Sequence, residues 1–574
     1  MRRAPSGIAL ALVLLGSACS VLVDFDDLSF SDPQTSGVGG NGGTTSVGGS
    51  PPAFVVYVSE TTGNDANDGL SPSTPKKSLA AGLGVAHELD GVGDVRVCEG
   101  TYASPTVHVD FDVALRGGYD CVRFEPGERD TIVVNDDAPG RERVTLALTG
   151  PAVTGATRVE GFILRGAGAG QGDTIAVRVS DLAAPQLSKN RIQGGEGSAM
   201  VRAGSIGMFV EGDAAPTILA NQIFGGTGVG AGGLHFSVGV WCYSATLELQ
   251  GNIIDGGLGT GSGDANVAST VGVRADACQV ESTRNTISGG SSPHSQGGSR
   301  GVFINLGGNT SIQQDRIYAL DGDTTVSIRN VFAIEVSGGS SVDVTNSMLM
   351  AEVAAIDMDL GPDNPTVAGA SISGVASPVL RHNTIFAHCA AGRCFGCTIC
   401  TDDASQGVTI EDNLLFSLGW DSLRPVQGIV LSETSAISSV RGNAVFGVGD
   451  VFVMQGYNAW AYFSDAEADA AVSNVSDNKE LKTECLMKPS CVPREFCDDP
   501  GVGGCVEQVF VAWSGADDGL STLQDLGWKL ASMAPCALAE SAHDTAPQVT
   551  VDHYGAPRTP APSAGAHEYN ELCL

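Results

Sequence analysis

Basic residues are scarce in this chain of 574 residues, and their scarcity argues against two classes of partner. Lys and Arg together number 31 against 65 for Asp and Glu, which gives a net charge of -34 at pH 7. A surface this acidic repels the phosphates of nucleic acids and of anionic membranes, so we expect neither as a direct partner. Aromatic residues are also sparse, at 6%, whereas Gly is abundant, with 77 residues. This composition suits thin coils joined by many tight turns.

The chain also lacks the familiar spacings of metal ligands and of a membrane-spanning helix. Its nine histidines form no His-Glu-x-x-His pattern, and no acidic loop has the EF-hand order. The apolar stretch from Ile8 to Leu15 is too short to span a bilayer. It follows Arg2 and Arg3 and precedes Cys19, an order that is typical of a secretory signal. We therefore assign residues 1–18 to a signal peptide.

A short motif, Asn-x-Ile-x-Gly-Gly, returns along the chain about once every thirty residues. Its copies begin at Asn190, Asn221, Asn252 and Asn285, and weaker copies begin at Asp315, Asn346, Asn383, Asn413 and Asn443. The successive spacings are 31, 31, 33, 30, 31, 37, 30 and 30. A fixed period of this length is typical of a solenoid.

Most copies follow a second element, a short run of small and aliphatic residues such as AVRV at Ala176 and GVRA at Gly272. Runs of four or five residues bounded by Gly, Ser, Asp or Asn favour strands over helices. Two or three short strands per period are what a parallel β-helix requires. The period therefore predicts an all-β parallel β-helix solenoid.

The repeated positions have different expected roles. A coil buries its inward side chains only when neighbours stack on it, roughly 4.8 Å away. We expect one inward aliphatic ladder: Ile192, Ile223, Ile254, Ile287, Ile317, Met348, Ile385, Leu415 and Val445. The Asn column is expected at a bend, because Asn tolerates left-handed backbone angles and its amide can bond from coil to coil. We interpret Asn190 to Asn443 as structural.

The cysteines are expected to form disulfides. They number 15, and if Cys19 carries a lipid the remaining fourteen can form seven pairs in an oxidising compartment. The run HCAAGRCFGCTIC contains Cys389, Cys394, Cys397 and Cys400. This spacing would suit zinc or an iron–sulfur cluster in a reducing compartment, but after an export signal we expect disulfides. His388 beside it is then incidental.

The first folded segment carries a family resemblance. VVYV at Val55 is followed by a turn and a Pro-Lys step, then by VRVCEGTY at Val95 and VALRGGYDC at Val113; the matching residues are Gly63, Asp65, Asp68, Gly69, Pro75 and Lys77. This order resembles the N-terminal segment of bacterial right-handed parallel β-helix proteins of the pectate-lyase-like superfamily. The resemblance implies a right-handed β-helix whose open end is covered by a helix over residues 78–87. Cys98 and Cys121 lie on successive early strands, where we expect a disulfide.

The N-terminus resembles a bacterial lipoprotein signal, through the run LLGSAC. The resemblance implies that Cys19 is acylated, and Ser20 implies sorting to the outer membrane of a Gram-negative cell. Leu15 lies one place further from the Cys than usual, so cleavage after Ala18 is the alternative. If Cys19 is acylated, residues 19–53 form the lipidated start and a flexible tether. The tether is expected from about Ser31, because the chain there has almost no bulky apolar residues.

From about Val453 the period disappears and cysteines become frequent. The last segment resembles the C-terminal part of bacterial β-helix proteins called choice-of-anchor Q, with the matches Asp552, Gly555, Arg558, Gly565, Ala566 and Glu568. In this interpretation Arg558 and Glu568 pair to hold the last coil. We therefore expect the β-helix over 54–452 and a cysteine-rich region with a terminal cap over 453–574.

No catalytic set stands out. Relatives of this fold include polysaccharide hydrolases, which need two carboxylates, and lyases, which need a base and often calcium. The polygalacturonase motifs Asn-Thr-Asp, Gly-His-Gly and Arg-Ile-Lys are absent.

Calcium is the single candidate cofactor, and two acidic loops carry its candidate ligands: Asp65, Asp68, Asp357, Asp359 and Asp363. The last three lie in the longest interval, which implies a projecting loop. Oxygen-rich loops can bind calcium, although the same residues also favour turns.

These observations predict an outer-membrane or cell-surface lipoprotein, held to the membrane by its lipid, whose β-helix binds carbohydrate or another envelope component. Two alternatives stay open: a polysaccharide lyase or glycoside hydrolase, and an adhesin or assembly protein with a protein ligand. Any specificity would lie on outward side chains and in the segments that break the period, chiefly the 346–383 interval, the 389–400 loop and the cysteine-rich tail.

Overall fold

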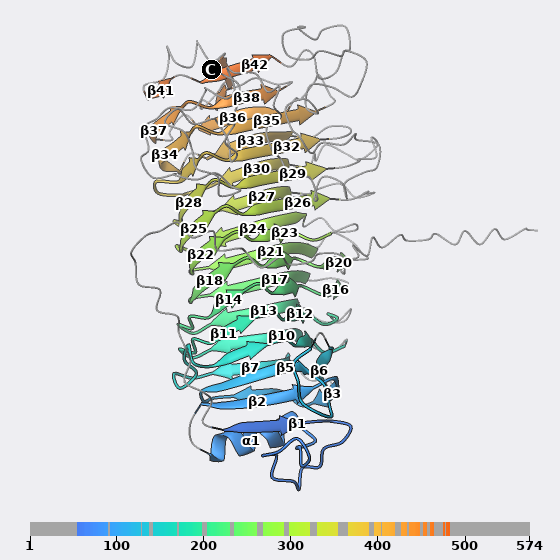
Figure 1. The fold of residues 1–574 in the computed structure, drawn as a ribbon. Helices are drawn as coiled ribbons and strands as arrows, with labels where there is room; N and C mark the ends of the chain where they lie inside the picture. Colours follow the sequence, from blue (N-terminus) through green and yellow to red (C-terminus); the bar gives the residue numbers. More distant parts are fainter. Residues whose placement is uncertain are drawn as a thin grey trace, which may run out of the picture. The chain divides into compact units, whose positions relative to one another are not determined.

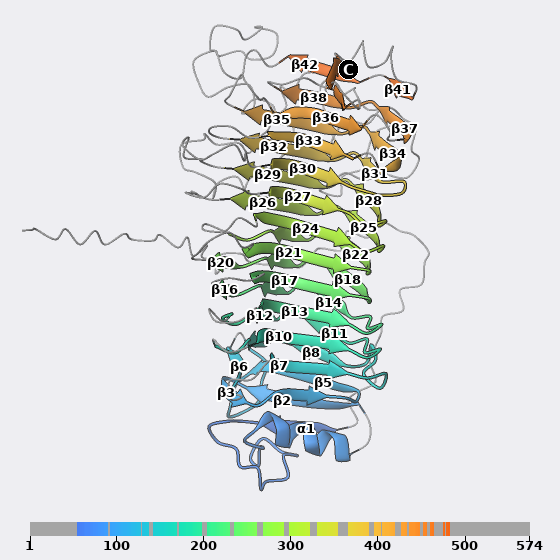
Figure 2. The same ribbon diagram turned by 180° about the vertical axis from the view of Figure 1, so that it is seen from behind.

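The structure is a computed structural model. It describes residues 54–482 except 90–91, 128, 137–141, 169–171, 198–203, 230–234, 261–267, 292–297, 322–329, 354–365, 390–394, 403, 420–425, 433–435, 448–451, 456–459, 464–473 and 477. Short strands stack coil upon coil into three long sheets, as Figure 1 and Figure 2 show from opposite sides. This is the predicted parallel β-helix.

Sheet A contains, in spatial order, β1 Val55–Val58, β2 Gly93–Cys98, β5 Val113–Tyr119, β8 Arg158–Glu160, β11 Gln186–Ser188, β14 Thr217–Leu219, β18 Thr246–Gln250, β22 Gln279–Thr283, β25 Asn309–Gln313, β28 Ser341–Thr345, β31 Val379–Arg381, β34 Gln406–Glu411, β37 Ala436–Arg441 and β41 Val475–Ser476.

Sheet B contains β3 Gly100–Ser104, β6 Thr131–Asn135, β9 Ile163–Arg165, β12 Arg191–Gln193, β15 Gln222–Phe224, β19 Ile253–Asp255, β23 Thr286–Ser288, β26 Arg316–Asp321, β29 Met348–Val353, β32 Thr384–Cys389, β35 Leu414–Gly419, β38 Ala444–Gly447 and β42 Lys479–Lys482.

Sheet C contains β4 Val107–Val109, β7 Glu142–Thr149, β10 Asp173–Ser180, β13 Ser205–Glu211, β17 His235–Tyr243, β21 Ala268–Asp276, β24 Ser299–Asn305, β27 Asn330–Val336, β30 Thr366–Ile372, β33 Phe395–Thr401, β36 Gln427–Ser432, β39 Phe452–Gln455 and β40 Trp460–Phe463. Only its last described pair, β39 with β40, is antiparallel. Two further strands, β16 Thr227–Val229 and β20 Leu258–Thr260, form a small sheet of their own.

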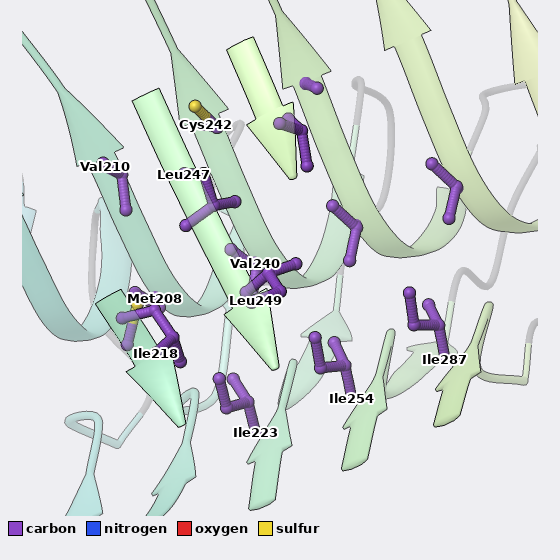
Figure 3. Packing of buried hydrophobic residues seen from close by; sticks show 14 of the residues in the cluster. Met208, Val210, Ile218, Ile223, Val240, Cys242, Leu247, Leu249, Ile254 and Ile287 are labelled. Atoms are coloured by element: carbon purple, nitrogen blue, oxygen red, sulfur yellow. The ribbon is translucent and has the colours of Figure 1, made fainter. Parts of the chain in front are cut away.

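One apolar core runs through the stack from Val56 to Val475. The predicted inward ladder lies in it: Ile223 and Ile254 are opposite one another on β15 and β19, and Ile287 follows on β23 (Figure 3). One member of that ladder differs from the prediction. Ile317 pairs with Leu349 rather than with Met348, because the coil at 346–383 is offset by one residue from the motif alignment.

The Asn column is hydrogen-bonded and buried, as the repeat suggested. Oδ1 of Asn221 accepts from the backbone N–H of Asn190 at 2.9 Å and from its Nδ2 at 3.1 Å, while Nδ2 of Asn221 donates to the carbonyl of Leu187 at 2.9 Å. Asn252 and Asn285 repeat the pattern. The column continues through Asp315, Ser347, Asn383, Asn413, Asn443 and Asn478. Each amide thus satisfies backbone groups at the bend between sheets A and B.

The left-handed backbone conformation lies one residue earlier than we expected. It occurs at Lys189 (φ 53°), Ala220 (φ 50°) and Arg284 (φ 57°), each just before a column member. Asn346 takes this preceding place, with φ 54°, and Ser347 supplies the column hydroxyl. The sequence motif could not separate the two positions, because Asn is suited both to positive φ and to amide bonding.

Asp315 is the one acidic member of the described column, and it is fully buried. Its Oδ1 accepts from the backbone N–H of Asn285 at 2.7 Å, and its Oδ2 accepts from the hydroxyl of Ser282. Ser282 stands where neighbouring coils have Leu249 or Ile218, so a hydroxyl donor replaces an aliphatic side chain beside the carboxyl. Burial raises the pKa of Asp315 to about 7, although these hydrogen bonds act to lower it.

A single helix, α1 Leu79–Glu88, covers the first coil (Figure 2). Ser78 caps it by accepting from the N–H of Ala81 at 3.2 Å. The helix lies so close to β1 that a Cβ on Gly82 would meet Val58 at 2.4 Å. The predicted cap over 78–87 is therefore present and seals the open end of the core.

The β-helix extends beyond residue 452, where we had placed its end. β42 pairs in parallel with β38, and Asn478 bonds Asn443 through both the backbone N–H at 3.1 Å and Nδ2 at 2.8 Å. Asn478 opens no recognisable Ile-x-Gly-Gly sequence, which is why the motif alone missed this coil.

Three disulfides lie within the described residues. The expected pair Cys98–Cys121 joins β2 to the turn after β5, and Cys397 joins Cys400 along β33. Cys242 and Cys278 are both buried in the core and join β17 to the turn before β22. The other cysteines of the seven expected pairs take part in none of these three disulfides.

Candidate functional site

Several residues singled out from the sequence lie outside the described part of the chain. They are Cys19, Asp357, Asp359, Asp363, Arg558 and Glu568. Their roles in lipidation, calcium binding and capping stay predictions. Within the described residues, no helix is both long and apolar enough to cross a membrane.

The two acidic residues of the N-terminal turn are held by protein donors. Asp65 Oδ1 accepts from the backbone N–H groups of Lys77 and Ser78 at 2.9 and 2.8 Å. Partial burial acts to raise the pKa of Asp65, but the bonds from Ser78 and Lys77 prevail and lower it. Hydrogen bonds from Thr74 and Leu70 lower the pKa of Asp68. Both carboxylates thus organise the turn that precedes α1.

Metal-ligating side chains do not gather elsewhere either. In the part of the chain that the structure describes, no three His, Cys, Asp or Glu side chains are placed to hold one ion. Calcium at Asp65 and Asp68 remains a prediction from their composition alone.

The outward face of sheet C carries an ordered row of aromatic and arginine side chains. In-register pairing of β10, β13, β17, β21 and β24 aligns five residues that we call the sheet C stripe: Arg178, Phe209, Trp241, Arg274 and Phe303. Strand alternation turns them outward, because the residues on either side of each one, such as Val240 and Cys242 beside Trp241, lie in the core. All five are partly exposed.

The stripe is held together by ring and guanidinium contacts. Phe209 and Trp241 have ring centroids 5.1 Å apart. The Arg178 guanidinium lies over Phe209 at 5.7 Å, and that of Arg274 lies over Trp241 at 4.6 Å and over Phe303 at 5.8 Å. Because each contact fixes a long side chain, the stripe is ordered before any ligand arrives.

Carboxylates on the same face complete the arrangement. Arg178 pairs with Glu142 and with Glu211, and its Nε lies 2.8 Å from Glu211 Oε1. Asp276 Oδ2 accepts from Arg274 Nε at 2.7 Å and from the indole N–H of Trp241 at 2.8 Å.

Two neighbours extend the row of polar and aromatic groups. Arg300 pairs with Glu335 and lies over Phe303 at 5.6 Å. Tyr243, two residues after Trp241 on β17, is 47% exposed and is the most open large ring beside the stripe.

Sequence reasoning did not find the stripe. The apolar runs that predict strands include GMFV at Gly207, GVWC at Gly239, GVRA at Gly272 and GVFI at Gly301, but no residue of these runs is assigned there to the outward face. The signal was present: the third residues of these four runs are Phe209, Trp241, Arg274 and Phe303. In a chain with only 6% aromatic residues, three rings at the same position of neighbouring coils form a local concentration of aromatic side chains.

A second group lies on the outward face of sheet B, where Glu352, in the interval that breaks the period, meets His388 on the next coil. His388 Nδ1 is 3.2 Å from Glu352 Oε1, and these residues are opposite each other on β29 and β32. The Glu352 side chain is 8% exposed, and its Oε2 is buried without a hydrogen-bond partner in the described structure. The imidazole, 20% exposed, contacts the ring of Phe386. His388, which the sequence marked as incidental, therefore belongs to a carboxylate–imidazole pair on sheet B.

Comparison with known proteins finds only weak likenesses. No protein-family model and no curated protein matches the sequence. Pectate lyase Pel9A is similar over 91% of this chain and 98% of its own, with 11% identity and a TM-score of 0.38. The Dettilon tailspike protein gp208 covers 70% of this chain and 68% of its own, with 11% identity and a TM-score of 0.35.

The A-module of mannuronan C-5 epimerase AlgE6 from Azotobacter vinelandii covers 66% of this chain and 92% of its own, with 14% identity and a TM-score of 0.31. Likenesses this weak carry no argument about what this chain does. Function has to be argued from the side chains.

Proposed function

We propose that this protein is a lipid-anchored surface protein whose β-helix binds a carbohydrate chain along the sheet C stripe. The observation that supports the proposal is the preordered row of aromatic rings with arginine and carboxylate groups between them. Binding sites combine aromatic and apolar surface with a few fixed polar groups in this way. Because the row runs along the axis over five successive coils, it suits an extended polymer more than a compact ligand.

The anchoring part of the proposal rests on the N-terminal sequence. Cys19 would carry the lipid, and residues 19–53 would hold the β-helix away from the outer membrane. Replacement of Cys19 by Ser is expected to release the protein from the membrane fraction, and mass spectrometry of the native N-terminus would reveal the acyl groups. An unmodified N-terminus at Cys19 or Ser20 would contradict the anchor.

The chain offers a matched pair of variants for the binding site. Phe209 on sheet C and Phe224 on sheet B are both partly exposed, and each has an arginine guanidinium 5.7 Å from its ring. Phe209→Ala should weaken binding to a polysaccharide about tenfold, as truncation of a binding hot spot does. Phe224→Ala should leave binding unchanged, because it lies on another sheet.

The assay is affinity electrophoresis of the full-length protein against a polysaccharide panel. Equal effects of the two substitutions would reject the stripe as the site. If a protein from the same envelope binds and no polysaccharide does, the adhesin alternative is correct.

The enzyme alternative has one specific observation in its favour, the Glu352–His388 pair. Glu352 would fix the imidazole so that its other nitrogen can take a proton from a sugar or a water molecule. The same panel, analysed for new reducing ends and unsaturated products, tests this alternative. Turnover that His388→Asn abolishes would establish it, whereas turnover unchanged by that substitution would exclude this pair.

A further inference from the structure

The charges around the stripe indicate which class of carbohydrate it accepts, and this inference rests on the proposed function. Three guanidinium groups, those of Arg178, Arg274 and Arg300, face four carboxylates. The carboxylates are Glu142, Glu211, Asp276 and Glu335. The arginines are therefore already neutralised by the protein itself.

Arg178 shows how little of this positive charge is free. Its Nε and Nη2 both bond Glu211, and its Nη1 bonds Glu142, so all three nitrogens are engaged. An acidic sugar that accepted from the remaining N–H groups of this guanidinium would place its carboxylate beside Glu142 and Glu211. These two glutamates would repel it.

Arg274 gives the same result at the centre of the stripe. Asp276 is 2% exposed and is shared between Arg274 and the indole of Trp241. Moving this aspartate would break two hydrogen bonds to a buried charge. A ligand without charge is not repelled by these carboxylates, and its hydroxyl groups can donate to the glutamates and accept from the guanidinium edges.

We infer that the stripe binds an uncharged polysaccharide and rejects polyuronates. The net charge of -34 acts in the same direction, since it repels a polyanion before contact.

The test compares two neutral polymers, β-glucan and galactomannan, with polygalacturonate and alginate, on the full-length protein. Binding to a neutral polymer should change little between low and high salt, because screening acts on charges. Polyuronates should not bind wild-type protein at either salt concentration.

Two glutamate substitutions test the charge argument directly. Glu211→Gln leaves a hydrogen-bond acceptor beside Arg178 but removes one negative charge. We expect weak polygalacturonate binding to appear at low salt, because loss of one close repulsive charge contact in water raises affinity about fivefold. Glu248→Gln on sheet A, where the glutamate bonds Thr217 at 3.0 Å, removes the same charge at a distance and should have no effect.

The outcomes separate the two proposals. Both proposals are supported if a neutral polymer binds, Phe209→Ala weakens that binding and Glu211→Gln gains binding to polygalacturonate. Polyuronate binding by wild-type protein that Phe209→Ala weakens keeps the site and overturns the uncharged ligand. Absence of binding to every polymer, or binding that is indifferent to Phe209→Ala, overturns the proposed function and this inference with it. Equal behaviour of Glu211→Gln and Glu248→Gln overturns the charge argument.

Discussion

Asp315→Asn should stabilise the β-helix at neutral and alkaline pH but hardly at acidic pH. The wild-type carboxyl is fully buried, and burial raises its pKa to about 7 from the 3.8 of an ordinary aspartate. Asparagine fills the same volume, remains uncharged and can donate its amide hydrogen as the other column members do. Its acceptor would be Ser282, which occupies the place of Leu249 in the coil before.

The sign of the pH dependence follows from linkage. Between pH 4 and pH 7 the folded state holds a proton on Asp315 that the unfolded state has lost, so the free energy of unfolding falls as the pH rises. The contribution is fully present below the unfolded pKa and is lost once the pH has passed the folded pKa. The gap of about three pH units corresponds to at most about 4 kcal/mol, at 1.36 kcal/mol per unit.

Urea unfolding at a series of pH values measures this difference. The stability advantage of Asp315→Asn over wild type should grow from near zero at about pH 4 to its full size by about pH 8. Asp343→Asn, which removes an exposed carboxylate from β28, is the control and should show no such growth. A difference that is constant over the whole pH range would refute the argument that a buried proton is linked to folding.

Three further predictions concern the scaffold. Asn252→Ala should lower the free energy of unfolding by about 2–4 kcal/mol, because it leaves the backbone N–H of Asn221 and the carbonyl of Ile218 buried without partners. Asn252→Gln should not restore this stability, since its longer side chain misplaces the amide. Replacing Cys242 and Cys278 by Ala should lower the free energy of unfolding by about 4 kcal/mol, whereas loss of Cys397–Cys400, which closes a far shorter loop, should cost about half as much. Ile223→Ala should lower the free energy of unfolding, measured in urea, by about 2–5 kcal/mol. Gln222→Ala, on the same strand and facing outward, should change it by no more than about 0.5 kcal/mol. Similar losses for both variants would contradict the inward face assigned to Ile223.

The fold was predictable because its stabilising contacts recur at a constant spacing. Ile192 and Ile223 repeat a core position and Asn190 and Asn221 repeat a polar one, so a single period contains the architecture. The prediction of the fold was less accurate where a coil keeps the geometry of the repeat but not the sequence of the motif. Ser347 bonds like an Asn, and Asn478 belongs to the column without the flanking Ile-x-Gly-Gly.

The candidate site was harder to predict because it depends on register between coils. Phe209, Trp241 and Arg274 are 32 and 33 residues apart, and each is an ordinary strand residue in its own coil. Their common position on the outward face can be recognised only when the strands are aligned and the inward residues are identified. Glu352 and His388 likewise come together through pairing of β29 with β32.

The Asn column gives the stack a direction. Each asparagine oxygen accepts from the coil before it, so the polar groups of a coil stay incomplete until the next coil toward the C-terminus has been laid down. The first coil is instead closed by α1, which follows β1 directly in the sequence and packs against β1, β2 and β4. A chain that emerges N-terminus first can therefore assemble in the order of its synthesis, with one unfinished edge at a time.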